Sequence, residues 1–175
     1  HIELFVKEPM SAWDAVYSKI LDALHGQHMH IIFDSDLNYY WDGWTYINEL
    51  QSQKKMGIII IEAEVDPYKY ELLSSLEDWK WDELNFEDGI IRDYKNLTVN
   101  GSLTLVIPGR RMEVVPTFIA SNIGQNGLHL SYKGQTYNLT AGDNIIPAVD
   151  LGEGDNTLVF SGSGTVSVAY RGGRL

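Results

Sequence analysis

Residues 94–107, YKNLTVNGSLTLVI, decide the fold class of the second half of this chain. Two runs in which apolar and polar residues alternate, as in strands with one buried face, flank Asn100-Gly101. Because Asn-Gly favours tight turns with positive φ, the pattern predicts a β-hairpin here. LHLSYKGQTYNLTAG (128–142) repeats the pattern over Lys133-Gly134. We therefore expect antiparallel β-structure in this region.

Short apolar runs separated by turn residues continue after the first hairpin, with no helical periodicity. The further strands are expected in MEVVPTFIAS (112–121), NIIPAVDL (144–151), NTLVFSG (156–162) and TVSVAYRG (165–172). FSGSGTV (160–166) is expected to be a hairpin loop, because a phosphate-binding glycine loop needs a following helix N-terminus. Strands at this spacing predict an antiparallel β-sandwich.

The first half contains one predicted helix among predicted strands. In PMSAWDAVYSKILDALHG (9–26), apolar residues recur at the spacing of a helix with one buried face. Ser11 is the expected N-cap, Asp14 its capping-box partner and Gly26 the residue that ends the helix. The strands are expected at residues 2–7, 28–33, 44–53 and 56–70. Four consecutive isoleucines, residues 58–61, predict that both faces of the last strand are covered at its middle.

This chain of 175 residues has a net charge of −11, and the charge is distributed unevenly along it. Residues 1–90 hold 18 acidic and 6 basic residues, a net of −12, whereas residues 91–175 hold 6 and 7, a net of +1. All five tryptophans lie in the first part. The break predicts two modules, 1–90 and 91–175, with residues 73–90 as an arm or linker. We predict a mainly β chain: strands plus one helix, then the sandwich.

No catalytic, cofactor or metal motif is complete in the sequence. There is no cysteine, and no G-x-S-x-G, Walker or dinucleotide-binding motif. His28 and His30 could share one face of a strand and bind a metal, but no third ligand is marked. DSDLNYYWDG (34–43) begins like a calcium loop, yet Tyr39 stands where a glycine is required. Acidic pairs such as Glu62/Glu64 have no defined spacing for hydrolysis and are expected on a solvated face. We expect no enzyme, no cofactor and no metal.

Two stretches of the chain carry a family resemblance. The first runs from EPMSAWDAVYSKI through DLNYYWDG to VDPYKY (8–70), and the second from VIPGRRMEVVPTFIAS (106–121) to the closing YRGGRL (170–175). In the order of their elements and in these short sequence motifs, they resemble the distal tail proteins of long, non-contractile-tailed bacteriophages (siphophages). Members of that family usually carry further residues at the start, so the resemblance implies an N-terminally truncated chain.

The resemblance implies a structural virion protein of the phage tail tip, or baseplate, made in the bacterial host cytoplasm. Its first domain, expected to be incomplete at its N-terminus here, would form a homohexameric ring when full length, through which DNA passes without being bound. Its second would be a galectin-like or carbohydrate-module-like sandwich. As a hub, the protein would join tail-tube and other tail-tip proteins to the receptor-binding proteins of host adhesion. No enzymatic activity, cofactor or membrane contact is implied.

Candidate interface residues are aromatic side chains of two segments in the first part, together with two C-terminal arginines. They are Tyr39, Tyr40, Trp41, Trp44, Trp79, Trp81, Phe86, Arg171 and Arg174. Aromatic residues are enriched at interfaces, although burial in the core is the alternative for each tryptophan. Arg171-Gly-Gly-Arg174 has no aromatic interleaving and no repeat, so it does not indicate nucleic-acid binding. The alternative function is a carbohydrate-binding module that recognises host cell-wall saccharide.

Overall fold

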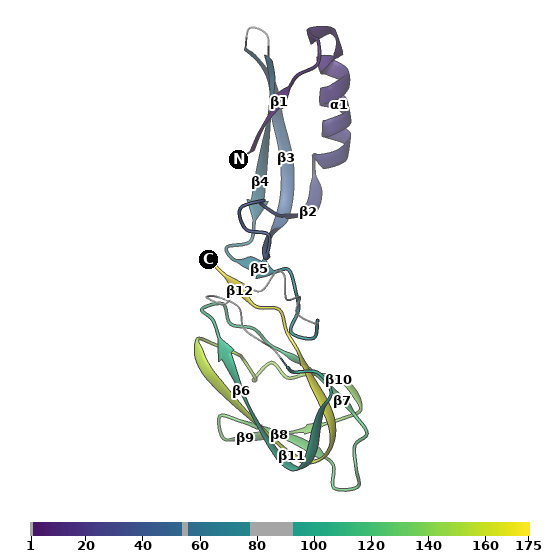
Figure 1. Cartoon of the computed structure of the whole chain (residues 1–175), viewed down its shortest axis with the longest axis vertical. Helices are drawn as coiled ribbons and strands as arrows, with labels where there is room; N and C mark the ends of the chain where they lie inside the picture. Colours follow the sequence, from purple (N-terminus) through teal and green to yellow (C-terminus); the bar gives the residue numbers. More distant parts are fainter. Residues whose placement is uncertain (1, 54–55, 78–92) are drawn as a thin grey trace. The chain divides into compact units, whose positions relative to one another are not determined.

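The computed structural model describes residues 2–53, 56–77 and 93–175 (Figure 1). These residues are mainly β, with one helix and two curled antiparallel sheets, and 56% of them are in strands. It divides into two compact units, His1–Lys69 (unit 1) and Tyr70–Leu175 (unit 2). The predicted fold class is therefore confirmed. The module boundary expected near residue 90 falls among residues outside the described ranges and stays a prediction, whereas residues 70–77 belong to unit 2.

The predicted helix is present, but it begins differently from the prediction. A 3-10 turn, η1 (Met10–Ala12), leads into α1 (Trp13–Leu24). The N-cap position is occupied by Ala12, without a side-chain cap hydrogen bond, so the assignment of Ser11 as N-cap is wrong. The reason is that Ser11 lies inside the 3-10 turn that precedes the helix, in which Ala12 N donates to Pro9 O at 2.8 Å. Within the part of the chain that the structure describes, no helix has the length and apolar character needed to span a bilayer.

Helix α1 is fastened to unit 1 at both ends. At its start Trp13 is buried, and its indole Nε1 donates to Glu8 O at 2.9 Å. At its end the Thr45 hydroxyl donates to Leu24 O, and Gly26 N donates to Thr45 O at 2.8 Å. Gly26 has a φ of +70°, in agreement with its predicted role. The bond to Leu24 O satisfies a carbonyl group that a helix end otherwise leaves without a partner.

The sheet of unit 1 is antiparallel, and α1 lies along one of its faces (Figure 1). Its strands are β1 (Ile2–Val6), β2 (Gln27–Ile31), β3 (Tyr39–Gln53) and β4 (Met56–Val65). β4 lies between β1 and β3, and β2 pairs with β3. Ile58, Ile59 and Ile61 are buried, as their run predicted. β3 starts at Tyr39, five residues before the strand expected at 44–53.

Unit 2 is built around one long strand. Its elements are β5 (Lys69–Glu71, whose first residue belongs to unit 1), β6 (Leu97–Gly109), β7 (Thr117–Ser121), β8 (Leu128–Tyr132), β9 (Gln135–Leu139), β10 (Gly142–Ile145), β11 (Gly154–Ala169) and β12 (Gly173–Arg174). β11 pairs with β6 along one edge; on the other it pairs with β8 and then with β7. The sheet thereby folds over a core in which Phe118 and Phe160 meet edge to face, with ring centroids 6.1 Å apart.

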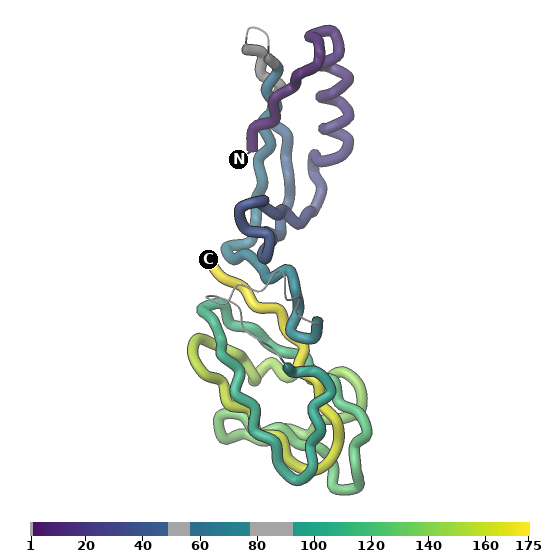
Figure 2. Tube along the Cα trace, in the orientation of Figure 1, coloured from purple at the N-terminus to yellow at the C-terminus, as the bar shows by residue number. Residues whose placement is uncertain are grey.

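Two predicted hairpins of unit 2 are wrong, and one is confirmed. Neither Asn100-Gly101 nor FSGSGTV reverses the chain, because β6 and β11 each continue through them. Gly101 lies opposite Gly162 in the ladder, with φ values of +88° and +102°. Figure 2 shows the two traces curling together in unit 2. These glycines thus adopt positive φ inside strands, where β11 changes partner. The hairpin over Lys133-Gly134 joins β8 to β9, as predicted.

Candidate protein interaction surfaces

The sheet face of unit 1 that α1 leaves uncovered carries aromatic and acidic side chains. Successive strand residues point to opposite faces, so the even-numbered residues of β3 from Tyr40 to Tyr46 share this one. Trp44 and Tyr46 are 49% and 37% exposed. The register places Trp44 between His28 of β2 and Glu64 of β4, and Tyr46 beside Glu62. We call this surface the aromatic–acidic face; it comprises His28, His30, Tyr40, Asp42, Trp44, Tyr46, Glu62 and Glu64.

The two predicted strand histidines share this face, with a carboxylate beside them. Asp42 Oδ1 lies 3.6 Å from His28 Nε2 and 3.4 Å from His30 Nε2. The imidazole of His28 meets the Trp44 indole edge to face at 5.2 Å, and His30 lies 4.1 Å from the Tyr40 ring. Across residues 2–53, 56–77 and 93–175, no group of three or more potential ligands is arranged to hold a metal ion. The imidazoles of both histidines thus pack against aromatic rings of this face.

The opposite face of the same sheet contains an apolar groove that sequence reasoning missed. Its volume is about 160 Å³, and its lining residues are Ile2, Ile31, Phe33, Trp41, Ile61, Ala63 and Val65. Phe33 is 46% exposed and Val65 is 36% exposed. Trp41, a predicted interface residue, lines this groove, whereas Trp44 lies on the other face, because the two positions differ by an odd number along β3.

The remaining aromatic interface candidates of the first part are either buried or outside the described residues. Tyr39 and Tyr40 are both buried. The Lys69 ammonium lies 5.0 Å from the centre of the Tyr39 ring and pairs with the Asp36 carboxylate. These contacts fix the start of β3 inside unit 1. The other predicted interface residues, Trp79, Trp81 and Phe86, lie outside the described residues.

The two C-terminal arginines belong to unit 2. Arg171 Nη1 donates to the backbone carbonyls of Glu71 and Leu72, and Nη2 lies 3.8 Å from Glu77 Oε1. Arg174 is half-buried in β12. The Arg171 guanidinium therefore holds residues 71–77 against the end of the chain, which is a structural role within the unit.

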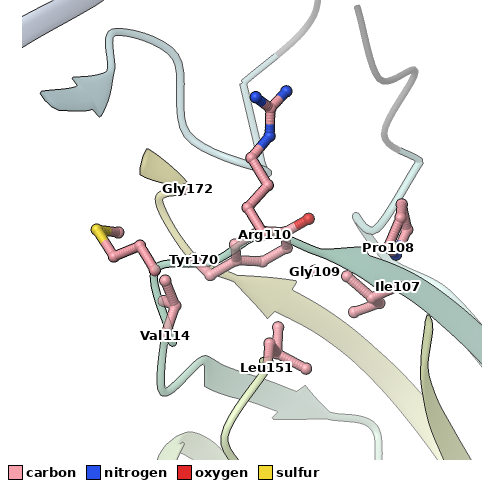
Figure 3. Close-up of a pocket in the computed structure, with 9 residues that line it drawn as sticks. Ile107, Pro108, Gly109, Arg110, Val114, Leu151, Tyr170 and Gly172 are labelled. Atoms are coloured by element: carbon pink, nitrogen blue, oxygen red, sulfur yellow. The ribbon is translucent and has the colours of Figure 1, made fainter. Parts of the chain in front are cut away.

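Unit 2 has a small hollow near these residues, shown in Figure 3. Ile107, Leu151 and Tyr170 line it, and the Arg110 guanidinium extends away from it. The hollow has a volume of about 10 Å³, which is room for roughly one water molecule. It is therefore too small to be a site for an organic ligand.

The aromatic residues of unit 2 contribute to its core. Tyr94, Phe118, Tyr132 and Phe160 are buried, and Tyr137 and Tyr170 are half-buried. Among the described residues of this unit, none is an exposed aromatic ring of the kind that stacks on a sugar. The exposed aromatic surface described above thus belongs to unit 1.

No family model, curated protein or solved structure matches this chain.

Proposed function

We propose that this protein is a structural component of a bacteriophage tail tip, a hub that joins the tail tube to the host-adhesion apparatus by protein–protein contacts. The sequence resemblance over residues 8–70 and 106–175 is the source of the phage assignment. The observation that carries the contact function is the aromatic–acidic face, where exposed rings lie on a fixed sheet.

The aromatic–acidic face has the composition of a binding surface. Tryptophan and tyrosine are the residues that most often dominate the energy of protein interfaces. Covering the exposed half of Trp44 would remove roughly 100 Å² of mainly apolar surface from water, a stabilisation of about 2–3 kcal/mol. The rings are also held in place before binding, by His28 beside Trp44 and by His25, which meets Tyr46 edge to face at 6.2 Å. Prior ordering lowers the entropy cost of association.

The acidic side chains of this face fit the same proposal. Glu62 and Glu64 are exposed on β4, in the part of the chain that has a net charge of −12. Negative charge repels the phosphates of DNA, so a ring of such units would let a genome pass without holding it. Complementary basic groups on partner proteins would select the correct neighbours and speed their association.

The test is to locate the protein in the phage particle. Antibodies against the chain, viewed by electron microscopy on purified particles, are expected to label the tail tip. Particles assembled with a Trp44→Ser/Tyr46→Ser double variant are expected to contain at least about tenfold less of the protein, since two central aromatic contacts are lost. Val106→Ser, which removes an apolar side chain 48% exposed in unit 2, is the matched control and should be incorporated normally.

Particles without label would refute the tail-tip assignment, and normal incorporation of the double variant would refute the role of the face. A glycan array provides the comparison with the alternative function. Saccharide binding that maps to residues 91–175 would favour a carbohydrate-binding module over a purely structural hub.

A further inference from the structure

Trp44 and Tyr46 of the aromatic–acidic face each lie directly opposite a glutamate. The register between β3 and β4 pairs Trp44 with Glu64 and Tyr46 with Glu62. Side chains at paired positions of neighbouring antiparallel strands point to the same face, with Cβ atoms roughly 4.5–5.5 Å apart. Two aromatic rings and two carboxylates therefore stand side by side in two cross-strand pairs, which we call the ring–carboxylate array.

The two carboxylates of the array are available to a partner. Glu62 and Glu64 are exposed, and neither makes a hydrogen bond or an ion pair with any residue that the structure describes. The third carboxylate of the face differs, because Asp42 Oδ1 is buried and lies beside the two histidines. Strands β2, β3 and β4 contain no lysine or arginine that would neutralise the glutamates. The array thus presents two uncompensated negative charges at neutral pH.

The two rings add a second attraction for a cation. An aromatic ring attracts a cation placed over its face within about 6 Å of the ring centre, and tryptophan does so most strongly. The planar guanidinium of arginine stacks on such a ring and donates paired hydrogen bonds to a carboxylate, whereas the ammonium of lysine is a compact, strongly hydrated charge. Trp44 has Glu64 on its β4 side and His28 on its β2 side. A ring paired with a carboxylate therefore favours arginine over lysine.

The spacing of the array suits an extended chain. Residues on the same face of a strand lie about 6.6–6.8 Å apart, which is twice the rise per residue. Trp44 and Tyr46 have this separation in sequence, as do Glu64 and Glu62 on the neighbouring strand. Alternate side chains of an extended peptide repeat at the same distance and point to one side. Two arginines separated by one residue therefore match both pairs of the array, whereas two adjacent arginines point to opposite sides of the peptide.

We propose that the ring–carboxylate array binds an extended segment of a partner protein that carries two arginines separated by one residue. One guanidinium stacks on Trp44 and pairs with Glu64, and the other stacks on Tyr46 and pairs with Glu62. This inference rests on the proposed function, because it concerns the same face. It adds the side chain, the spacing and the backbone conformation that the face selects in its partner.

The test titrates the whole chain with three blocked heptapeptides in which two cationic residues are surrounded by serine and glycine. The first has two arginines separated by one serine, the second has lysines at the same two positions, and the third has the two arginines adjacent. Binding is followed through backbone amide and indole NMR signals. The first peptide is expected to bind at least about fivefold more tightly than either of the others and to shift the indole N–H signal of Trp44.

Two double variants separate the rings from the charges. Trp44→Leu/Tyr46→Leu keeps apolar side chains and should bind the spaced arginine and lysine peptides with affinities within about twofold of each other. Glu62→Gln/Glu64→Gln keeps both rings and should lose at least about tenfold in affinity for the spaced arginine peptide. Asp14→Asn/Asp22→Asn makes the same change in net charge at exposed positions of α1, on the other side of the sheet, and should bind like the unaltered chain.

Three results would overturn the inference: equal binding of the spaced arginine peptide and either other peptide, equal losses in the two amide variants, or no binding of the spaced arginine peptide. The last result, in a chain that sediments as a dimer, would assign the face to a second copy of the protein. None of these results bears on whether antibodies label the tail tip. Particles without label would refute the tail-tip assignment and leave the arginine preference of the face standing, so the two proposals fail separately.

Discussion

Gly162→Ala is expected to lower the free energy of unfolding of unit 2 by about 2–5 kcal/mol. The φ of +102° is one that an L-residue adopts at a cost of roughly 1–2 kcal/mol. An added Cβ would also lie 2.1 Å from Gly127 O, so the backbone must move apart, which costs about 1–3 kcal/mol more. That movement strains a hydrogen bond as well, because Ser163 N donates to the same oxygen at 3.0 Å.

The matched control lies directly across the ladder. Gly101 has a φ of +88°, but nothing lies within 4 Å of the Cβ that alanine would add. Gly101→Ala should therefore cost only the backbone part, about 1–2 kcal/mol. Urea unfolding, followed through the backbone amide signals of β11 in NMR spectra, gives both losses for unit 2 itself. Equal losses for the two substitutions would refute the argument that close approach of residue 127 makes Gly162 the more sensitive position.

Three further changes have expected outcomes. Lys133→Met should return the lowered pKa of the Asp150 carboxyl toward 3.8, because Lys133 Nζ donates a hydrogen bond to Asp150 Oδ1 at 2.8 Å; a carbon NMR titration measures this pKa. In the unaltered chain, the stability that this pair contributes is present above pH 3.8 and is lost as the pH falls through the lower folded-state pKa. Phe160→Ala, at a fully buried position, should cost unit 2 about 3–5 kcal/mol in urea unfolding, and a loss under 1 kcal/mol would contradict the core assignment. Thr45→Val should cost unit 1 about 1–2 kcal/mol in a melt followed by tryptophan fluorescence, whereas Thr45→Ser, which keeps the hydroxyl that donates to Leu24 O, should cost less.

Hydrophobic periodicity predicted the elements of this fold well. The apolar spacing of residues 13–24 is that of α1, and the isoleucines at 58–61 are the covered middle of β4. These features follow from residues close together in the chain, which decide locally whether a face is buried. The Lys133-Gly134 hairpin was predictable for the same reason: a tight turn is determined by the few residues that form it.

The glycines of β6 and β11 show where structure prediction from a short stretch of sequence fails. Asn-Gly favours positive φ, and the sequence was interpreted as a chain reversal because hairpin turns need that conformation. A bend within a strand needs it too. Gly101 lies opposite Gly162, so both strands change direction together and remain paired. That pairing joins residues about sixty positions apart, as the register shows, and no short stretch of sequence contains it.

The candidate surfaces were only half predictable. The alternation of β3 already implies that Trp41 and Trp44 point to opposite faces. The place of Asp42 beside His28 and His30 depends on the register between β2 and β3, which tertiary packing fixes. The groove likewise depends on this register, because Ile31 of β2 lies opposite Trp41 of β3 and both line it. A search for aromatic residues alone therefore found the rings and missed the groove.

The contacts that close unit 2 also set the order in which it can be made. Glu71 N donates to Gly172 O at 2.9 Å, and the Ser75 hydroxyl donates to Val168 O at 2.8 Å. The partners are separated by 93 to 101 positions along the chain. A ribosome adds residues one at a time from the N-terminus, so residues 71–75 must wait for nearly a hundred more before their partners exist. Unit 2 is thus expected to complete its fold only once Gly172 has been synthesised, whereas unit 1 can fold while the rest of the chain is still being translated.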